Sequence, residues 1–257
     1  MLEAKNITMT YDKGGVNELT IFKDFSLAIN DGQFLSVVGS NGSGKTTLLN
    51  IISGSLTPQE GSVILNGNDI SAEKEYRRNK RIGRVFQDPS MGTCPNMTIT
   101  ENLALADNKG SSFGLRAAID KRKETEFRDL VASLSLGLED KMDMKMGSLS
   151  GGQRQALSLL IATLRPIDLL ILDEHTAALD PVNSEFIMEL TRKTVEKMHL
   201  MTIMVTHNLR HAVEYGDRLV MMDKGTAVLD IDGEAKKHTR VEDVLGIFNS
   251  ISIECGN

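Results

Sequence analysis

The chain of 257 residues carries 29 Lys and Arg against 35 Asp and Glu, which gives a formal net charge of −6 at neutral pH. Its 40% hydrophobic and 25% charged fractions are typical of a soluble globular protein and exclude a disordered chain. The acidic balance and an aromatic content of 4% argue against a surface for nucleic acid, whether through phosphates or stacked bases. The length admits one large domain or two small ones.

Neither the cysteines nor the apolar runs indicate export or a membrane span. Cys94 and Cys255 lie far apart and are expected to be reduced thiols. The richest apolar stretch, residues 156–164, is too short to cross a bilayer. The N-terminus lacks the basic flank and the apolar stretch of a secretion signal. We therefore expect a soluble, cytosolic chain.

The N-terminal segment is rich in predicted strands. Apolar and polar residues alternate weakly over residues 2–10, and Asn30-Asp31-Gly32 is a turn signal between two apolar runs. Further along, short apolar runs are separated by helical patterns, which favours buried parallel strands. The other expected strands are residues 25–29, 34–38, 62–65, 169–172, 202–205 and 219–222.

Between these groups of strands the signals are helical. Helices are expected over about 100–103, 118–136 and 151–164, after a loop at 88–96 that contains two prolines and a glycine. Six basic residues from Lys74 to Arg84, beside Glu73 and Glu75, favour a solvated helix face over a nucleic-acid patch. A short helical tail is expected over residues 239–250. The predicted organisation is an α/β lobe of residues 1–87 and 166–235, an inserted helical lobe of residues 88–165, and a C-terminal tail of residues 236–257.

A complete phosphate-binding loop follows the strand expected at residues 34–38. Residues 39–47 read GSNGSGKTT, which satisfies G-x-x-x-x-G-K-[ST] between a strand and a helix. The glycines let the backbone turn its N–H groups toward phosphate oxygens, and the helix start adds a favourable dipole. Lys45 supplies a cation for the β- and γ-phosphates, and the Thr46 hydroxyl is a candidate Mg²⁺ ligand. The predicted phosphate-binding residues are Gly39, Ser40, Asn41, Gly42, Ser43, Gly44, Lys45, Thr46 and Thr47.

Two acids, Asp173 and Glu174, directly follow the apolar run at residues 169–172. They lie at the carboxyl end of the expected strand, which is the edge where ligands bind in parallel α/β sheets. Asp173 is predicted to be the metal-side carboxylate, acting through water. Glu174 is predicted to be the general base that polarises the attacking water.

A further motif narrows this P-loop protein to one family. Leu149-Ser150-Gly151-Gly152-Gln153 stands immediately before an expected helix and resembles the signature sequence of the ATP-binding cassette (ABC) family. A capping serine and two glycines at a helix start form a second anion site. Because the phosphate loop is already complete, we expect Ser150, Gly151, Gly152 and Gln153 to contact the nucleotide of a second copy of the chain.

The remaining motifs of the ABC family occur in the family's order between about residues 3 and 230, and the resemblance implies a role for each. Gln87 stands where the Q-loop glutamine reaches the metal and the attacking water. Asp180, in Ala-Leu-Asp, stands in the D-loop, which crosses the dimer interface. His207 matches the switch histidine that contacts the γ-phosphate. Tyr11 lies where an aromatic ring stacks on adenine.

The resemblance implies an α/β P-loop NTPase fold with a mixed central sheet, an N-terminal antiparallel β subdomain and an inserted helical subdomain. It implies an ATPase that uses ATP and Mg²⁺ and dimerises head to tail around two nucleotides. The same resemblance places the dimer at the cytoplasmic face of the cell membrane, where separate permease subunits would dock near residues 87–98. No nucleic-acid partner is expected, and an extracytoplasmic substrate-binding protein would accompany an importer of this kind.

The wording of the motifs resembles ATPases of importers with permeases of the branched-chain amino acid kind, which favours a small solute such as an amino acid. Two departures are His175, where proline is usual, and Ala177, where serine is common; neither replaces a residue with predicted chemistry. An exporter ATPase is one alternative. A soluble ABC-type ATPase acting on nucleic acid or the ribosome would need a coiled-coil insertion, zinc cysteines or two cassettes. A P-loop kinase would leave residues 149–153 unexplained.

Overall fold

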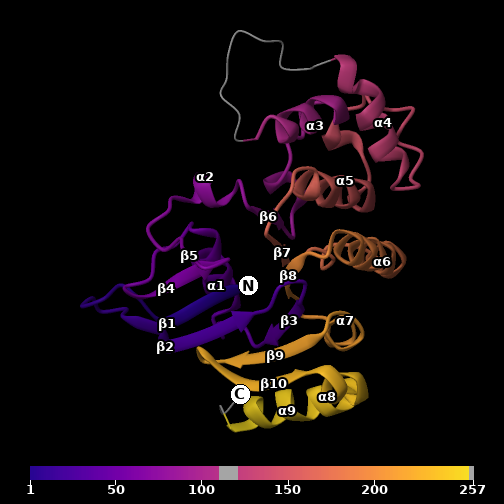
Figure 1. The fold of residues 1–257 in the computed structure, drawn as a ribbon. Coiled ribbons are helices and arrows are strands. Elements are labelled where there is room, and N and C mark those ends of the chain that lie inside the picture. The colour runs from indigo at the N-terminus through magenta and orange to yellow at the C-terminus, as the bar shows by residue number, and fades with distance from the viewer. Residues whose placement is uncertain (110–120, 255–257) are drawn as a thin grey trace.

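The computed structural model describes residues 1–109 and 121–254, which form two sheets and a set of helices stacked in layers (Figure 1). The strands are β1 (Leu2–Tyr11), β2 (Leu19–Ile29), β3 (Phe34–Gly39), β4 (Glu60–Leu65), β5 (Asn68–Asp69), β6 (Ile82–Val85), β7 (Leu169–Asp173), β8 (Met201–Val205), β9 (Arg218–Asp223) and β10 (Thr226–Asp232). An antiparallel sheet has the order β2-β1-β4-β5, and a six-stranded sheet has the order β10-β9-β3-β8-β7-β6. The larger sheet is parallel except for the β9–β10 pair, so the predicted fold class is confirmed.

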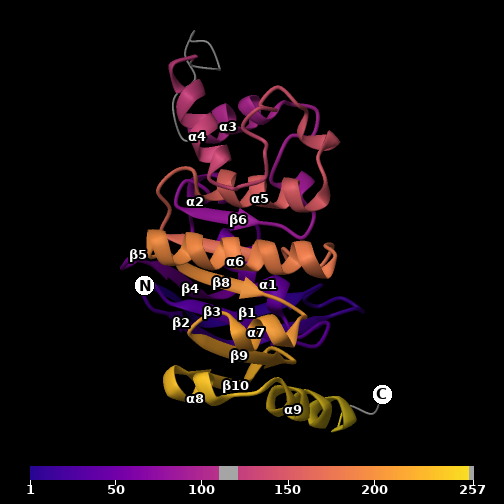
Figure 2. The same ribbon diagram turned by 90° about the vertical axis from the view of Figure 1, so that its right-hand side faces the viewer.

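The helices lie on both sides of the larger sheet and at its two ends. They are α1 (Lys45–Ser53), α2 (Glu75–Arg78), α3 (Ile99–Asp107), α4 (Glu124–Ala132), α5 (Gly151–Thr163), α6 (Pro181–Met198), α7 (Leu209–Glu214), α8 (Gly233–His238) and α9 (Val241–Glu254). Figure 2 shows α6 running along one face of the sheet, α3 and α4 at one end of the molecule, and α8 and α9 at the other. None of the helices in the described ranges combines the length and apolar character that a bilayer crossing requires.

Helix α1 lies in a core that both sheets share. Its side chains Leu48, Leu49, Ile51 and Ile52 are fully buried. They belong to one apolar cluster with Phe22 of β2, in the antiparallel sheet, and with strands β3, β7 and β8 of the larger sheet. Since burial of a large apolar side chain contributes about 1.5–3 kcal/mol, this packing holds the first turn of α1, and the loop before it, in place.

The segment between β6 and β7 is helical and contains no strand within its described part. An apolar cluster joins α3, α4 and α5 through Leu103, Phe127 and Leu157, and it also includes Ile187 of α6. Thr98 begins α3 with a capping box: its hydroxyl accepts from the Glu101 N–H, and the Glu101 carboxylate accepts from the Thr98 N–H. These contacts satisfy helix-end donors locally, and the helical segment shares its core with α6.

Several predicted element boundaries are wrong. The helix expected over residues 118–136 ends at Ala132, because Ser135 and Gly137 adopt positive φ values of 56° and 62° that a right-handed helix does not continue; residues 118–120 lie outside the described part of the chain. The helix expected over residues 239–250 runs as α9 from Val241 to Glu254, preceded by the separate helix α8. Strand β10 is missing from the predictions because it is a mostly exposed edge strand whose apolar run is only three residues long. The turn at residues 30–32 forms as predicted, although β2 and β3, which it joins, belong to different sheets.

The basic segment at residues 74–84 is not a solvated helix face. Helix α2 is only four residues long, and Arg84 belongs to strand β6. The Arg78 side chain is buried, and its guanidinium donates to four backbone carbonyls at 2.8–3.0 Å. Two of these carbonyls, of Ile51 and Ile52, belong to the last turn of α1, where helix carbonyls lack partners within the helix. Burial lowers the pKa of Arg78, and the nearby charges of Glu73 and Asp69 oppose that shift.

Replacing Arg78 with Met is expected to lower the free energy of unfolding by about 2 kcal/mol, because buried carbonyls lose their donors. Urea denaturation followed by circular dichroism measures this change. Arg77, its exposed neighbour on α2, is the matched control, and Arg77→Met should change stability by less than about 0.5 kcal/mol. Equal stabilities of the two variants would contradict a structural role for the Arg78 hydrogen bonds.

Candidate functional site

The phosphate loop connects β3, an interior strand of the larger sheet, to the start of α1. Gly39 ends the strand and Gly44 caps the helix, with φ values of 153° and 104°. A Cβ atom on Gly39 would lie 2.1 Å from the Met222 carbonyl oxygen, and one on Gly44 would lie 2.8 Å from the Phe22 ring. The loop conformation therefore needs glycine at both positions for reasons of backbone angle and of space.

Lys45 directs its charge back into the loop. Its ammonium donates to the carbonyl oxygens of Gly39 and Ser40, both at 2.8 Å, and to the Ser43 hydroxyl at 3.4 Å. Only 5% of the residue is exposed. Burial lowers the pKa of Lys45, while the charge of Glu174 acts in the opposite direction. A concentrated positive charge therefore lies in the loop that was predicted to hold phosphates.

The other loop residues divide into exposed and anchored positions. Asn41, Gly42 and Thr46 are exposed, and Thr47 is buried. The Ser40 hydroxyl donates to the Asp223 carboxylate at 3.0 Å, which ties the loop to β9; the sequence prediction did not include Asp223. Tyr11 ends β1 beside the loop, with its hydroxyl 3.5 Å from the Thr47 hydroxyl and 39% of the residue exposed.

Glu174 and His207 come together from the ends of two neighbouring strands. Glu174 follows β7, with φ at 49°, and its N–H donates to the Val205 carbonyl of β8 at 2.9 Å. Two residues after Val205, His207 places its Nε2 atom 2.8 Å from Glu174 Oε1. The sheet order β8-β7 thus unites two residues that are 33 positions apart in the sequence.

A cavity of about 140 Å³ lies between the phosphate loop and this carboxylate–imidazole pair. The predicted loop, Glu174 and His207 all contribute to its wall, and Ile21 of β2 is a wall residue that the sequence prediction missed. Asp173 lies beside the cavity, where its carboxylate is paired with Arg84 at 2.6 Å, and Gln87 is exposed just beyond the end of β6. The cavity lining residues are Ile21, Asn41, Gly42, Gly44, Lys45, Thr46, Thr47, Glu174 and His207.

The motif at residues 149–153 forms a capped helix start, away from this cavity. The Ser150 hydroxyl accepts from the Gln153 N–H at 3.3 Å, and the Gln153 side-chain oxygen accepts from the Ser150 N–H at 3.1 Å. A Cβ atom on Gly152 would lie 2.7 Å from the Asn183 side chain, which in turn donates to Asp180. Ser150 and Asp180 therefore begin two helices that lie against each other, and no residue of this motif lines the cavity around Lys45.

His175, which departs from the family pattern, is buried behind Glu174. Its Nε2 atom lies 3.2 Å from the Thr191 hydroxyl of α6, and that hydroxyl donates to the Ile187 carbonyl at 2.7 Å. The hydroxyl hydrogen is thereby used, so the imidazole is the donor. Burial, aided by the nearby His211, lowers the pKa of His175 to about 3, and the neutral ring links the segment after Glu174 to α6.

A domain model described as "ABC transporter" matches residues 22–177 of this chain. The chain belongs to the ABC transporter family. This ABC ATPase is 46% identical over 96% of its length to the tyrosine transport ATP-binding protein of Clostridioides difficile (strain R20291), and the match covers 98% of that protein. It is 34% identical to the spermidine/putrescine import ATP-binding protein PotA of Haemophilus ducreyi (strain 35000HP / ATCC 700724), over 90% of this chain and 57% of that longer protein.

Solved structures agree with this assignment. The ABC ATPase superposes with a TM-score of 0.76 on the dimeric post-hydrolysis structure of the ATP-binding cassette MJ0796 bound to ADP and Pi. The two chains are 29% identical, and the match covers 90% of this chain and 98% of the other. The cavity between the phosphate loop and the Glu174–His207 pair is thus in an ATP-binding, ATP-hydrolysing cassette. Membership of the family establishes the fold of the chain and its activity as a transporter ATPase.

Proposed function

We propose that this ABC ATPase drives the import of an amino acid, tyrosine being the leading candidate, from the cytoplasmic face of a cell membrane. The observation that carries the catalytic part is the 2.8 Å contact between Glu174 and His207 in the wall of the phosphate-loop cavity. The similarity to a tyrosine transport ATP-binding protein, over nearly the whole length of both chains, supports tyrosine as the transported solute. The absence of a candidate spanning helix from the described residues agrees with separate permease subunits.

The chain's own residues supply the groups for hydrolysis. Lys45 and the loop N–H groups hold the β- and γ-phosphates, and Tyr11 stacks on the adenine. Glu174 takes a proton from the attacking water while the water oxygen bonds to the γ-phosphorus. At the same time the bond between the γ-phosphorus and the oxygen that leaves with ADP breaks. His207, the partner of Glu174, contacts the γ-phosphate. A general base of this kind accelerates a reaction by about 10²–10⁴-fold.

The residues beside the cavity fit Mg²⁺ bound together with nucleotide. Within the described ranges there is no cluster of three or more His, Cys, Asp and Glu that could hold a metal alone. The Thr46 hydroxyl and the Asp173 carboxylate are oxygen donors, and Mg²⁺ is held by one or two protein oxygens plus phosphates and waters. We assign Thr46 and Asp173, with Gln87, to this site. Bound Mg²⁺ neutralises charge on the β- and γ-phosphates.

A second copy of the chain completes each site. Ser150 at this helix start is exposed and is followed by two glycines, and no residue of the motif lines the chain's own cavity. Such a helix start binds phosphate oxygens. We propose that Ser150, Gly151, Gly152 and Gln153 of one protomer contact the ATP held by the other, with Asp180 at the same interface.

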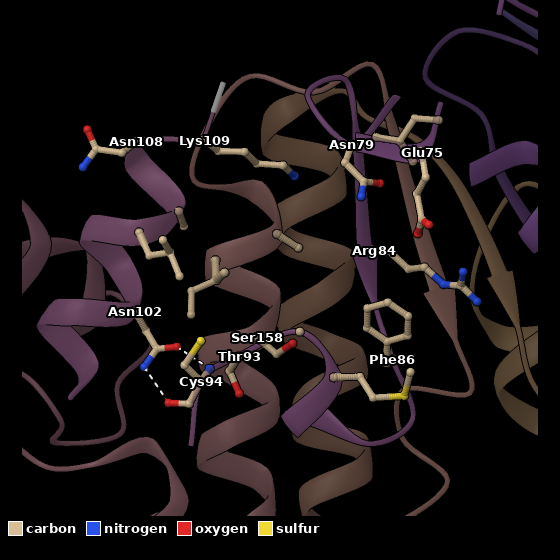
Figure 3. A pocket seen from close by; sticks show the side chains of 17 residues that line it. Glu75, Asn79, Arg84, Phe86, Thr93, Cys94, Asn102, Asn108, Lys109 and Ser158 are labelled. Carbon is tan, nitrogen blue, oxygen red and sulfur yellow. Dashed lines mark hydrogen bonds between the residues drawn. The ribbon is translucent and has the colours of Figure 1, made fainter. Parts of the chain in front are cut away.

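The permease is proposed to dock in a groove of about 460 Å³ between the sheet lobe and the helical lobe, the latter taken as residues 88–165 (Figure 3). Phe86, Met91 and Leu105 give the groove apolar walls, and Met91 and Leu105 are largely exposed. The buried Asn102 side chain holds one rim: it accepts from the Cys94 N–H at 2.7 Å and donates to three carbonyls, including that of Cys94. These hydrogen bonds tie α3 to the chain segment of residues 94–98 at this rim.

Co-purification tests the proposal. A tagged chain carrying Glu174→Gln is purified from detergent-solubilised membranes in the presence of Mg-ATP, and the retained proteins are identified. We expect a permease, and we expect proteoliposomes with that permease and the parent chain to take up labelled tyrosine on addition of ATP, with an extracytoplasmic binding protein where import requires one. Retention of ribosomes or DNA without a permease would overturn the transport assignment. ATP-driven release in place of uptake would overturn its direction.

A further inference from the structure

Arg84 connects the proposed permease groove to the Asp173 carboxylate. Its Nη2 atom lies 2.6 Å from Asp173 Oδ2, with the two side chains only 13% and 16% exposed. Arg84 of β6 pairs in register with Ile171 of β7, so Asp173 is the diagonal neighbour two residues further along the same face. The ion pair is thus a consequence of the strand register and lies at the edge of the sheet where the nucleotide site is.

The rest of the guanidinium is held from two further sides. Nη1 donates to the Asn50 side-chain oxygen at 3.0 Å and approaches the Ser53 hydroxyl at 3.4 Å, both on α1. The guanidinium carbon lies 4.7 Å from the centre of the Phe86 ring, one residue before Gln87. A cation over an aromatic face is attracted to it. Arg84 therefore touches the helix that follows the phosphate loop, the Asp173 strand and the residue before Gln87.

The same side chain also borders the groove. Arg84 and Phe86 form one wall of the 460 Å³ groove, on the side away from Asn102 (Figure 3). The Arg84 Nε atom is buried and has no hydrogen-bond partner among the described residues. A polar atom left without a partner in the interior is costly, so the Arg84 Nε atom makes an unfavourable contribution to stability.

We propose that Arg84 acts on the metal side of the site through Asp173: it offsets part of the charge of that carboxylate, and so sets how tightly Mg²⁺ is held with nucleotide. The inference rests on the proposed function, which assigns Asp173 to Mg²⁺. The expected direction of the change in Mg²⁺ affinity follows from electrostatics. A resident cation beside the carboxylate repels a second cation, so removing the arginine charge strengthens Mg²⁺ binding, whereas a merely structural arginine would leave the Mg²⁺ requirement unchanged.

The test measures Mg²⁺ binding with ADP, so that no turnover contributes. A fluorescent ADP analogue is bound to the full chain, and its signal is followed as Mg²⁺ is added. For Arg84→Met we expect the half-saturating Mg²⁺ concentration to fall about fivefold. Binding of ADP without Mg²⁺ should stay within about twofold. Arg84→Lys, which keeps the charge, should restore the parent Mg²⁺ dependence.

The chain offers a matched control at the other end of the same two strands. Arg81 and Asp168 form an ion pair, also at 2.6 Å, where β6 and β7 begin. Arg81→Met removes an equivalent pair away from the nucleotide site and should leave the Mg²⁺ dependence unchanged. Circular dichroism melting verifies that each variant is folded. Arg84→Gln, which keeps hydrogen-bond donors without the charge, replaces Arg84→Met if the latter does not fold and should shift Mg²⁺ binding in the same direction.

Asp173→Asn tests the assignment of Asp173 to Mg²⁺ separately from the role of Arg84. This variant should weaken Mg²⁺ binding at least about tenfold, since the carboxylate that holds Mg²⁺ through water loses its negative charge. An unchanged Mg²⁺ dependence in Asp173→Asn would refute the metal assignment of the proposed function. A weakened dependence in Asp173→Asn combined with no shift, or with weaker Mg²⁺ binding, in Arg84→Met would overturn the inference about Arg84 and leave the proposed function standing.

Discussion

Glu174→Gln is expected to lower ATP turnover at least about 100-fold while leaving Mg-ATP binding nearly intact. Glutamine matches glutamate in size and can still accept a hydrogen bond from His207, which lies 2.8 Å from Glu174 Oε1. It cannot accept a proton from water. Phosphate release measures turnover, and binding of a fluorescent ATP analogue measures affinity. ATP would persist in the site, so the dimer should live longer in size-exclusion chromatography with Mg-ATP.

A second glutamate–histidine pair supplies the matched control for this variant. Glu185 Oε1 lies 3.2 Å from His211 Nε2, outside the cavity that contains Lys45. Glu185→Gln removes a comparable charge from a comparable pair, and it should retain turnover within about twofold because neither residue contacts the cavity. Near-normal hydrolysis by Glu174→Gln would remove Glu174 from the role of general base.

Ser150→Arg should abolish hydrolysis, with a loss of at least about 100-fold, while the affinity of the monomer for ATP stays largely intact. The reason is that Ser150 lies on an exposed helix start and does not line the cavity of its own chain. A long cation there blocks the approach of the helix to the nucleotide of the second protomer. Turnover is measured by phosphate release, and affinity is measured at concentrations too low for the dimer.

Ser150→Arg also removes the helix cap, and that effect must be separated from the steric block at the nucleotide of the second protomer. Ser150→Ala removes the cap, which costs about 1 kcal/mol, without adding bulk, so it should retain much more activity than Ser150→Arg. Mixing the two inactive variants provides a sharper test of whether Ser150 acts across the dimer interface. A dimer of Ser150→Arg with Glu174→Gln has one intact composite site, so the mixture should recover part of the activity that both variants lack alone. Equal loss of monomer binding and turnover in Ser150→Arg, or no recovery in mixed dimers, would show that Ser150 does not act across the interface.

Local sequence accounts for the parts of the site that depend on neighbouring residues. Gly39, Gly44 and Lys45 could be predicted because a tight loop between a strand and a helix demands glycine and a cation at fixed spacing. Strand β7 could be predicted because a strand buried on both faces reads as a run of apolar residues, and its carboxyl end then locates Asp173. The cap at Ser150 follows from the hydroxyl and the Gln153 three residues later.

Contacts between distant segments could not be predicted in the same way. Arg84 was grouped with a solvated basic stretch, although its place between Gly83 and Val85, in an otherwise apolar strand, was a signal for burial. Its partner Asp173 is 89 residues away, and only the parallel register of β6 and β7 brings the two together. Ile21 entered the cavity wall by a similar route, because the antiparallel sheet packs over α1.

By itself the sequence determined the chemistry of this ABC ATPase: the phosphate loop, the acids after β7, and the capped helix start at Ser150, each encoded within about ten residues. Only the tertiary structure decided which groups meet. The order of the central sheet places Glu174 against His207, and its strand register places Arg84 against Asp173. The physical reason is that backbone angles, caps and strand patterns depend on near neighbours, whereas a charge pair across strands depends on register and on packing of the whole core.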